Sequence, residues 1–231
     1  MEQAYAHHQR KRSAPRRDGL FTRGTVLEAA GRVFAELGYE KATNREICER
    51  AGVNGAAINY YFGGKEALYE EVLVEAHRQL VSTEELNAVM DSGGRPEEKL
   101  RAFLELAVRA ARKAPELWGL PVLLRELASP SSNLPAPLVD SVLPKLGVVR
   151  SLVCEVTGFE PGSEKASHAA AMLLMPCMFL VLFPEKMQAL LLPGFMEKPE
   201  SMVESMVSYV MGGLNALKAR KEQKGDESPE A

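Results

Sequence analysis

The sequence predicts an all-α protein of two domains, and three observations lead to this prediction. Apolar residues recur every three to four positions through most of the 231 residues, as they do on helices with one buried face. No segment alternates apolar and polar residues as strands do, and no internal repeat is visible. Hydrophobic residues make up 46% of the chain, so it can bury a core larger than one small module needs.

The N-terminal 20 residues are polar and basic, with Arg10-Lys11-Arg12 and Arg16-Arg17. They carry too little apolar surface to fold alone, so we expect a disordered basic arm over residues 1–20. Residues 1–62 hold ten Lys and Arg against seven Asp and Glu, a net charge of +3, which leaves −6 for the rest of the chain. A mildly positive head on an acidic body suits a nucleic-acid partner.

Two short helices with a tight turn between them are predicted after a first helix that opens at Thr22 and stops at Gly38. Thr43 and Glu46 have the spacing of a capping box, so a helix begins near Asn44. Gly52 then allows a sharp turn. Asn54 is a good N-cap for the next helix, whose first turn, Gly55-Ala56-Ala57, is nearly bare and lets the backbone approach another surface.

The second of these helices divides into two faces. Ile58, Tyr61 and Phe62 share one face and are expected to pack inward, while Asn59 and Tyr60 point outward. Gly63-Gly64 ends the helix, and Lys65 opens another whose N-terminal N–H groups suit a phosphate. The pattern indicates a helix-turn-helix that reads a DNA groove; the alternative is a pair of short helices in an all-α core with one polar face.

A string of short motifs runs through residues 22–62 and just beyond. They are F-A-E-x-G-Y from Phe34, A-T at Ala42, I-x-x-x-A-G-V from Ile47, Y-F at Tyr61 and K-E at Lys65. In these motifs the segment closely resembles the DNA-binding domain of the tetracycline-repressor family. The resemblance implies a dimeric, ligand-controlled transcription factor, usually a repressor. Asn59 stands where this family often has Tyr, and Gly64 where it often has a Ser or Asn helix cap, so Gly64→Ser is expected to cap the third helix.

The candidate DNA contacts lie in and around the two short helices. Arg45 has the fork that reads a guanine edge, and Asn59 could read an adenine edge. Thr43, Tyr60 and Lys65 are placed for phosphates. The full set of candidates is Thr43, Asn44, Arg45, Asn54, Gly55, Ala56, Ala57, Asn59, Tyr60 and Lys65.

The rest of the chain predicts a helical body. We assign residues 21–66 to the N-terminal three-helix helix-turn-helix DNA-binding domain, 67–218 to a C-terminal helical ligand-binding and dimerisation domain, and 219–231 to a disordered tail. The expected body elements are a helix from Lys65 past Leu80, one from Pro96 to Lys113, one over 116–128, a loop over 129–137, a helix over 138–156 interrupted at Pro144 and Gly147, an apolar helix over 164–183 kinked or broken at Pro176, and a last helix over 202–218.

The helix over 164–183 is apolar almost all round, which predicts burial on nearly every side. The family resemblance implies that the last two helices form a four-helix homodimer interface, and such a helix has more apolar surface than a monomer of this size readily covers. The alternative is a deeply buried helix in a monomer core.

A ligand cavity is the last expected site. Phe103, Trp118, Arg125, Met175 and Phe179 would suit an adaptable pocket for a small-molecule inducer that is largely apolar. The alternative is that these residues are plain core.

Other function classes find little support. Cys48, Cys154 and Cys177 are too widely spaced for a zinc module or a disulfide framework, and no metal or cofactor motif is present. No nucleophile–base constellation is recognisable, so we expect no enzyme. The longest apolar run, 169–183, is short of the ~20 residues that span a bilayer, and no signal peptide is visible, so we expect a cytoplasmic protein without a membrane partner. A helical ligand- or partner-binding protein that does not bind DNA is the alternative function.

Overall fold

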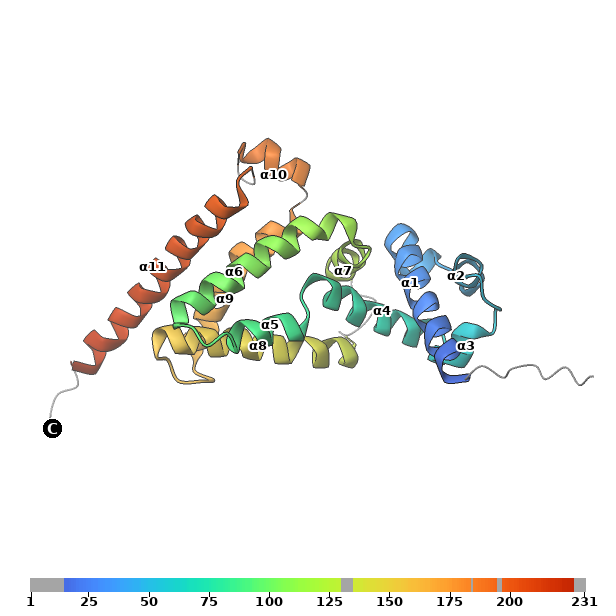
Figure 1. Cartoon of the computed structure of the whole chain (residues 1–231), viewed down its shortest axis with the longest axis horizontal. Coiled ribbons are helices and arrows are strands. Elements are labelled where there is room, and N and C mark those ends of the chain that lie inside the picture. The colour runs from blue at the N-terminus through green and yellow to red at the C-terminus, as the bar shows by residue number, and fades with distance from the viewer. Residues whose placement is uncertain (1–14, 130–134, 184, 195–196, 227–231) are drawn as a thin grey trace, which may run out of the picture. The chain divides into compact units, whose positions relative to one another are not determined.

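The structure, a computed structural model, describes residues 15–129, 135–183, 185–194 and 197–226. Every regular element in these ranges is a helix, which confirms the all-α prediction (Figure 1). Internal contacts divide the chain into an N-terminal unit that ends at Tyr69 and a C-terminal unit that begins at Glu70. This boundary falls three residues beyond the predicted one.

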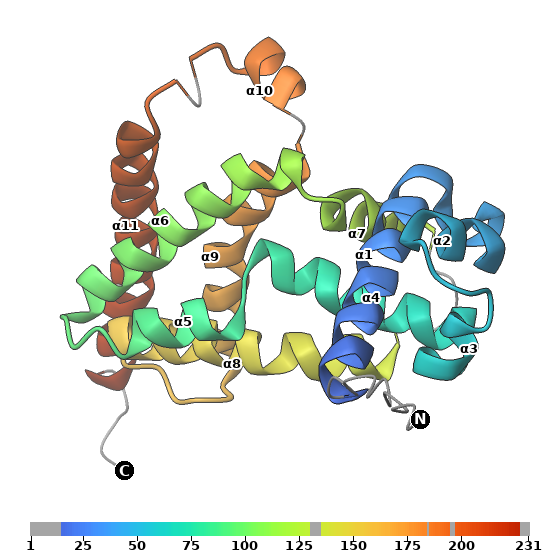
Figure 2. The same ribbon diagram turned by 45° about the vertical axis from the view of Figure 1, so that its right-hand side comes forward.

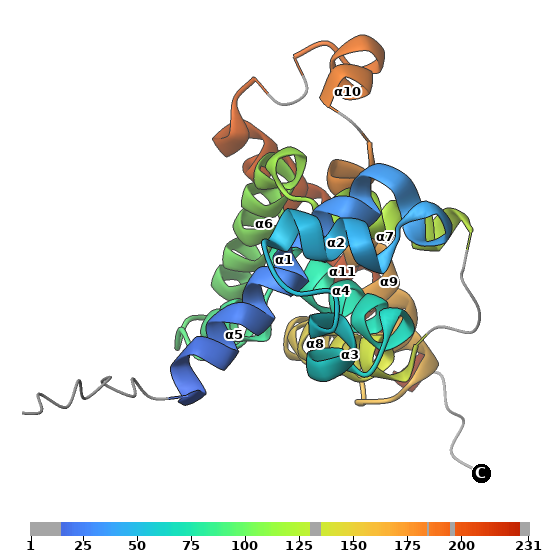
Figure 3. The same cartoon turned by 90° about the vertical axis from the view of Figure 1, so that its right-hand side faces the viewer.

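The N-terminal unit is a small bundle of short helices (Figure 3). Its helices are α1 (Pro15–Lys41), α2 (Asn44–Ala51), α3 (Ala57–Phe62) and the first residues of α4 (Lys65–Leu80). Helix α1 packs against both α2 and α3. The largest fully buried side chains are Val26, Val33, Phe34, Ile47, Ile58 and Leu68, so each helix contributes to the core.

Both ends of the chain are more helical than the sequence predicts. Helix α1 begins at Pro15, so the last six residues of the predicted arm over 1–20 are helical, and residues 1–14 lie outside the described ranges. At the other end α11 continues to Asp226, beyond the predicted start of the tail at residue 219. A helix extends into charged sequence at low cost, because Lys, Arg, Glu and Gln are good helix formers.

The C-terminal unit is a larger bundle in which α6, α8, α9 and α11 surround one core (Figure 2). Leu100, Leu104, Leu152 and Leu173 are its large, fully buried side chains. The elements are α5 (Thr83–Met90), α6 (Pro96–Lys113), the 3₁₀ turn η1 (Ala114–Glu116), α7 (Gly119–Ala128), α8 (Ala136–Thr157), α9 (Glu164–Leu182), α10 (Glu185–Leu191) and α11 (Pro199–Asp226).

Helices α8 and α9 continue through their internal prolines, so the predicted interruption of α8 at Pro144 and Gly147 is wrong, and α9 is not broken at Pro176. Each proline removes the hydrogen bond to the carbonyl four residues earlier. Those carbonyls belong to Asp140 and Met172, which lie on exposed faces where water can donate to them instead. The cost of each proline is therefore small enough for packing of the opposite face to hold the helix.

Helix α4 ends at Leu80 and does not run past it as predicted. Ser82 starts α5 with a reciprocal cap: its hydroxyl accepts a hydrogen bond from the Glu85 N–H at 3.1 Å, and the Glu85 carboxylate accepts one from the Ser82 N–H at 2.9 Å. The backbone hydrogen bond from Ser82 holds the pKa of Glu85 below its usual value. This cap stabilises the break between α4 and α5, although the apolar pattern of the sequence continues without a helix-breaking residue.

Helix α9 is less buried in the single chain than predicted. Met172, Met175 and Met178 are 58%, 63% and 42% exposed and share its outer face. By length and composition α9 could cross a membrane, although only 28% of its most apolar window is buried here. One such helix is weak support for a membrane protein.

Candidate nucleic-acid interface

Helix α2 begins after Thr43 and ends at Gly52, as its sequence predicts, although of the predicted capping box the described contacts show only the threonine half. The Thr43 hydroxyl accepts a hydrogen bond from the Glu46 N–H at 3.2 Å, which satisfies a free donor of the first turn. At the other end Gly52 has φ 67°, a left-handed conformation that is costly for residues with a Cβ. Gly52 and Val53 then donate to the carbonyls of Glu49 and Cys48. The chain thus turns sharply after α2 with its last carbonyls satisfied.

Helix α3 begins at Ala57, later than a cap at Asn54 predicts. The Asn54 side chain accepts a hydrogen bond from the Ala56 N–H at 2.8 Å, and its carbonyl accepts one from the Ala57 N–H at 2.9 Å. Asn54 therefore forms a turn before the helix. Asn54, Gly55 and Ala56 are exposed, whereas Ala57 is 8% exposed and its side chain belongs to the core.

The two faces of α3 lie as the spacing predicts. Ile58 and Phe62 are buried, and Asn59 and Tyr60 are exposed, with Tyr60 81% exposed. The Tyr61 ring is half-buried and stands edge-on to the Tyr60 ring, 4.8 Å between centroids. A large aromatic ring held in solvent by its neighbour has no role in the core, which makes it available to a partner.

Arg45 is the most exposed cation of α2, with 87% of its side chain accessible. Its Nε donates to the Glu49 carboxylate at 2.7 Å, and this hydrogen bond raises the pKa of Arg45. A pair between exposed side chains contributes little to stability, so a phosphate or a base edge can replace Glu49. Its neighbour Asn44 differs, because the amide oxygen of Asn44 is buried and has no hydrogen-bond partner among the described residues.

Arg50 is a cation of α2 that sequence reasoning left without a role. Its Nη1 donates to the Glu36 carboxylate of α1 at 2.7 Å, and its Nη2 lies 3.9 Å from Glu46. The side chain is half-buried, so the pair ties α2 to α1 and orients the helix that carries Arg45. Only the fold brings Glu36 and Arg50 together, 14 residues apart.

Lys65 stands at the first residue of α4, as predicted, and an aromatic ring holds its side chain. The Lys65 ammonium lies 4.4 Å from the centroid of the Tyr39 ring, a cation–π contact. Tyr39 in turn packs against Phe34 and Tyr69. Burial raises the pKa of the Tyr39 hydroxyl, with Glu66 and Glu40 adding to the shift, so the ring stays neutral. Lys65 is thus fixed beside the free N–H groups of a helix start.

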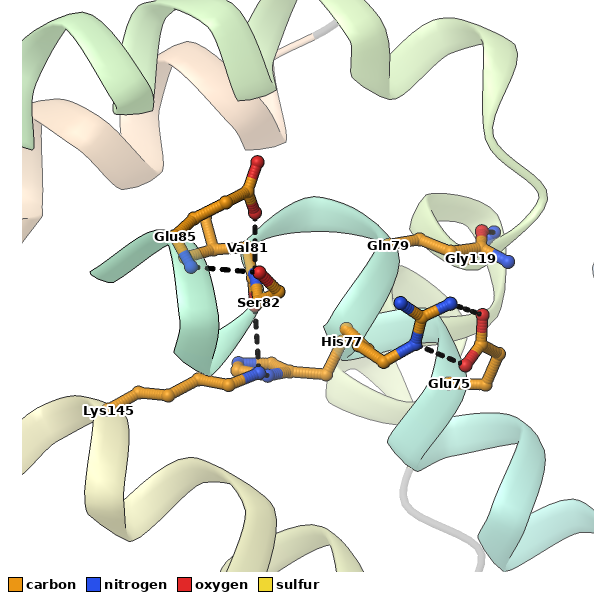
Figure 4. Close-up of polar contacts among 9 residues, drawn as sticks. Glu75, His77, Gln79, Val81, Ser82, Glu85, Gly119 and Lys145 are labelled. Carbon is orange, nitrogen blue, oxygen red and sulfur yellow. Dashed lines mark hydrogen bonds and ion pairs between the residues drawn. The ribbon is translucent and has the colours of Figure 1, made fainter. Parts of the chain in front are cut away.

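Polar contacts hold the far end of α4 within the C-terminal unit (Figure 4). The buried Lys145 of α8 donates to the Val81 carbonyl at 2.8 Å, and its Nζ lies 2.8 Å from His77 Nδ1. Burial lowers the pKa of His77 to about 4, with the Lys145 ammonium contributing to the shift. The neutral ring therefore accepts a hydrogen bond from the ammonium.

Helix α7 contacts the same part of α4 at very short range. A Cβ on Gly119 would stand 2.8 Å from the Cα and the carbonyl oxygen of Ala76, so only glycine fits there. The Gly119 N–H donates to the Gln79 side chain at 3.2 Å. Between them α7 and α8 hold α4 on two sides.

A cavity of about 520 Å³ lies elsewhere in the C-terminal unit, between the ends of α6 and α9 and helices α7 and α10. Its wall includes none of the five predicted ligand residues. Phe103 and Trp118 are buried, Phe179 is half-buried with its ring 4.5 Å from that of Phe183, and Arg125 and Met175 are exposed. The cavity wall comes from two stretches far apart in the sequence, 111–124 and 180–188, which no local pattern brings together.

Comparison with known proteins places these features in a family. Residues 26–72 match the family described as "Bacterial regulatory proteins, tetR family". The HTH-type transcriptional regulator BetI of Rhizobium meliloti (strain 1021) is 33% identical over 96 residues, 41% of this chain and 45% of BetI. The HTH-type transcriptional repressor AcnR of Corynebacterium glutamicum is 48% identical over 48 residues, 21% of this chain and 26% of AcnR. The chain thus spans less than half the length of these relatives.

Solved structures extend the likeness to both units. A putative transcriptional regulator from Pseudomonas aeruginosa PAO1 superposes with a TM-score of 0.69 and 22% identity, over 92% of this chain and 98% of the other. The fatty acid degradation regulator FadR from Bacillus halodurans gives a TM-score of 0.62 and 20% identity, over 88% and 98%. At such identities the likeness shows the fold alone. Taken with the match over residues 26–72 and the relatives that are regulators, it assigns residues 26–72 to the tetR family of bacterial regulatory proteins and gives both units the fold of the solved structures.

Proposed function

We propose that the protein is a ligand-responsive transcriptional repressor of the cytoplasm that binds an inverted-repeat operator as a homodimer. One observation carries this proposal: the side chains of Arg45, Asn59 and Tyr60 are exposed on the two short helices while the opposite faces of those helices are buried. The core does not need these three side chains, whereas recognition of DNA needs exposed side chains of this kind.

DNA contact divides between base reading and phosphate binding. Arg45 and Asn59 are the base-reading residues, with Arg45 exchanging Glu49 for a guanine edge. Lys65 and Tyr60 bind phosphates, Lys65 from the start of α4 and Tyr60 from the outer face of α3. Thr43, Asn54, Gly55 and Ala56 supply exposed backbone and small side chains for close approach.

The homodimer interface is formed by α9 and α11. The outer face of α9 exposes Met172 and Met175, and α11 exposes Tyr209 at 75%. Burying these apolar side chains against a second copy removes them from water at about 25 cal/mol per Å². Two reading helices then meet successive major grooves, about 34–36 Å apart.

Release from DNA passes through α4, because this helix begins beside Lys65 and ends in the contacts with Lys145 and Gly119. A small molecule, held in an apolar site of the C-terminal unit such as the one expected near Phe103, Trp118 and Arg125, releases DNA only if it favours a position of α4 that the operator does not. Its largest effect equals its difference in affinity for the two positions.

The test is a set of binding titrations on operator and scrambled duplexes at several salt concentrations. Arg45→Ala should lose about 1–3 kcal/mol on the operator alone, whereas Lys65→Ala should weaken both duplexes and lower the log–log salt slope by about one. Equal losses for Arg45→Ala on both duplexes would overturn the assignment of base reading. A chain that binds neither duplex, or that stays monomeric and protects one half-site, would instead favour the helical binding protein that does not contact DNA.

A further inference from the structure

The cavity in the C-terminal unit has an apolar wall with positive charge on it. Its apolar lining includes Leu120 and Leu124 of α7 and Leu180 and Phe183 at the end of α9. Its volume of about 520 Å³ falls within the range of small-molecule sites. An apolar space of this size in a folded unit favours a hydrocarbon or ring system over a polar metabolite.

The charged lining residues are both cations: Arg112, in the last turn of α6, and Lys186 of α10. Both side chains are exposed, and neither forms an ion pair within the ranges that the structure describes. No carboxylate belongs to the described lining of the cavity. A ligand group beside Arg112 and Lys186 therefore meets two positive charges, although Arg112 also lines a second groove whose wall includes Glu105, Glu200 and Glu204.

The wall that carries Lys186 is firmly attached. Gln188 is 5% exposed, and its amide donates to the carbonyls of Leu180 at 3.0 Å and Phe183 at 2.7 Å. These two bonds hold α10 across the end of α9, where the last carbonyls of a helix otherwise need partners. Helix α10 thus forms one side of the cavity, so that Lys186 and Arg112 line the same cavity.

We propose that this cavity binds an amphiphilic acid, with the hydrocarbon part between α7 and the end of α9 and the carboxylate between Arg112 and Lys186. The chemistry of the lining selects the ligand: apolar surface for the tail and two cations for the head. The binding step is independent of the proposed function. Only its effect on the operator rests on that function.

The experiment titrates three probes of equal tail length into the full-length protein by calorimetry: decanoate, decanol and decyltrimethylammonium. Decanoate should bind more tightly than the cation by at least about tenfold, because the head groups carry opposite charge at the same place. Shortening decanoate to octanoate should weaken binding roughly fourfold per methylene lost, as expected for a buried tail.

The decisive variant is Arg112→Gln combined with Lys186→Gln, two substitutions of exposed side chains that should leave folding intact. It should weaken decanoate about tenfold and decanol less than twofold. Arg109→Gln is the matched control, since Arg109 is exposed on the same helix and does not line the cavity. Trp118, the single tryptophan, is buried two residues before Leu120 and gives an independent fluorescence signal.

The outcomes separate the two proposals. Equal losses for decanoate and decanol in the double variant, or no binding of any probe at about 1 mM, would overturn the cavity proposal. Operator titrations with decanoate then address the regulatory proposal alone. Decanoate that binds through Arg112 and Lys186 yet leaves operator affinity unchanged supports the cavity assignment and refutes decanoate-controlled release.

Discussion

The contact between His77 and Lys145 predicts a loss of stability in mild acid. His77 has its pKa lowered to about 4 in the folded chain, from about 6.5 when unfolded. The unfolded chain therefore takes up a proton first as the pH falls, so stability is fully present above pH 6.5 and is lost between pH 6.5 and 4. If the whole pKa shift of His77 acted on stability, the free energy of unfolding would fall by about 2 kcal/mol between pH 7 and pH 5. Because His77 is half-buried, solvent screening reduces the expected loss to about 1 kcal/mol.

The assay is urea unfolding at pH 7 and pH 5 at one protein concentration, since dimerisation would make stability depend on concentration. His77→Gln should lose about 1 kcal/mol less than the wild type between the two pH values. His168→Gln is the control, because the His168 side chain is 69% exposed on α9, and it should keep the wild-type difference. If His77→Gln and the wild type lose the same stability, burial of His77 does not set the pH dependence and the reasoning fails.

Two further predictions concern the N-terminal unit. Glu49→Gln removes a negative charge from α2 and frees Arg45, so duplex affinity in a gel-shift titration should rise about two- to threefold at low salt. The control is Glu98→Gln, which breaks a similar exposed pair with Arg95 and should leave duplex affinity unchanged. No gain in affinity for Glu49→Gln would contradict a DNA-facing Arg45. Gly64→Ser should destabilise the chain by about 1 kcal/mol in thermal unfolding. Gly64 has φ 149°, and the backbone strain of a serine there exceeds the few tenths of a kcal/mol that a helix cap contributes. A stabilised variant would refute this prediction.

The expectation for Gly64 shows where the sequence is a poor guide. The motif string suggests a serine cap at this position, but a positive φ is a property of the folded backbone that no spacing reveals. By contrast the Thr43 cap, the Gly52 turn and the start of α6 at Pro96 are local features, and all three were predictable because each depends on residues within one turn.

Features that depend on several helices were not predictable. The salt bridge of Arg50 with Glu36 needs α1 beside α2, and the cavity needs the ends of α6 and α9 together. The internal prolines also could not be judged from the sequence. Whether Pro144 breaks a helix depends on whether Asp140 faces water, and only the packing of α8 decides that. The local sequence therefore predicts that Asn59 and Tyr60 are exposed on α3, but it does not predict which residues line the cavity.

The absence of a side chain at Gly119 limits how α4 and α7 can move against each other. Since the glycine backbone already touches that of Ala76, neither helix can press further into the other without steric overlap. The permitted displacements are sliding along the contact or separation from it. A ligand that shifts α7 must therefore move α4 sideways or release it, and Gly119→Ala should push the two helices apart, because its Cβ would overlap the Ala76 backbone.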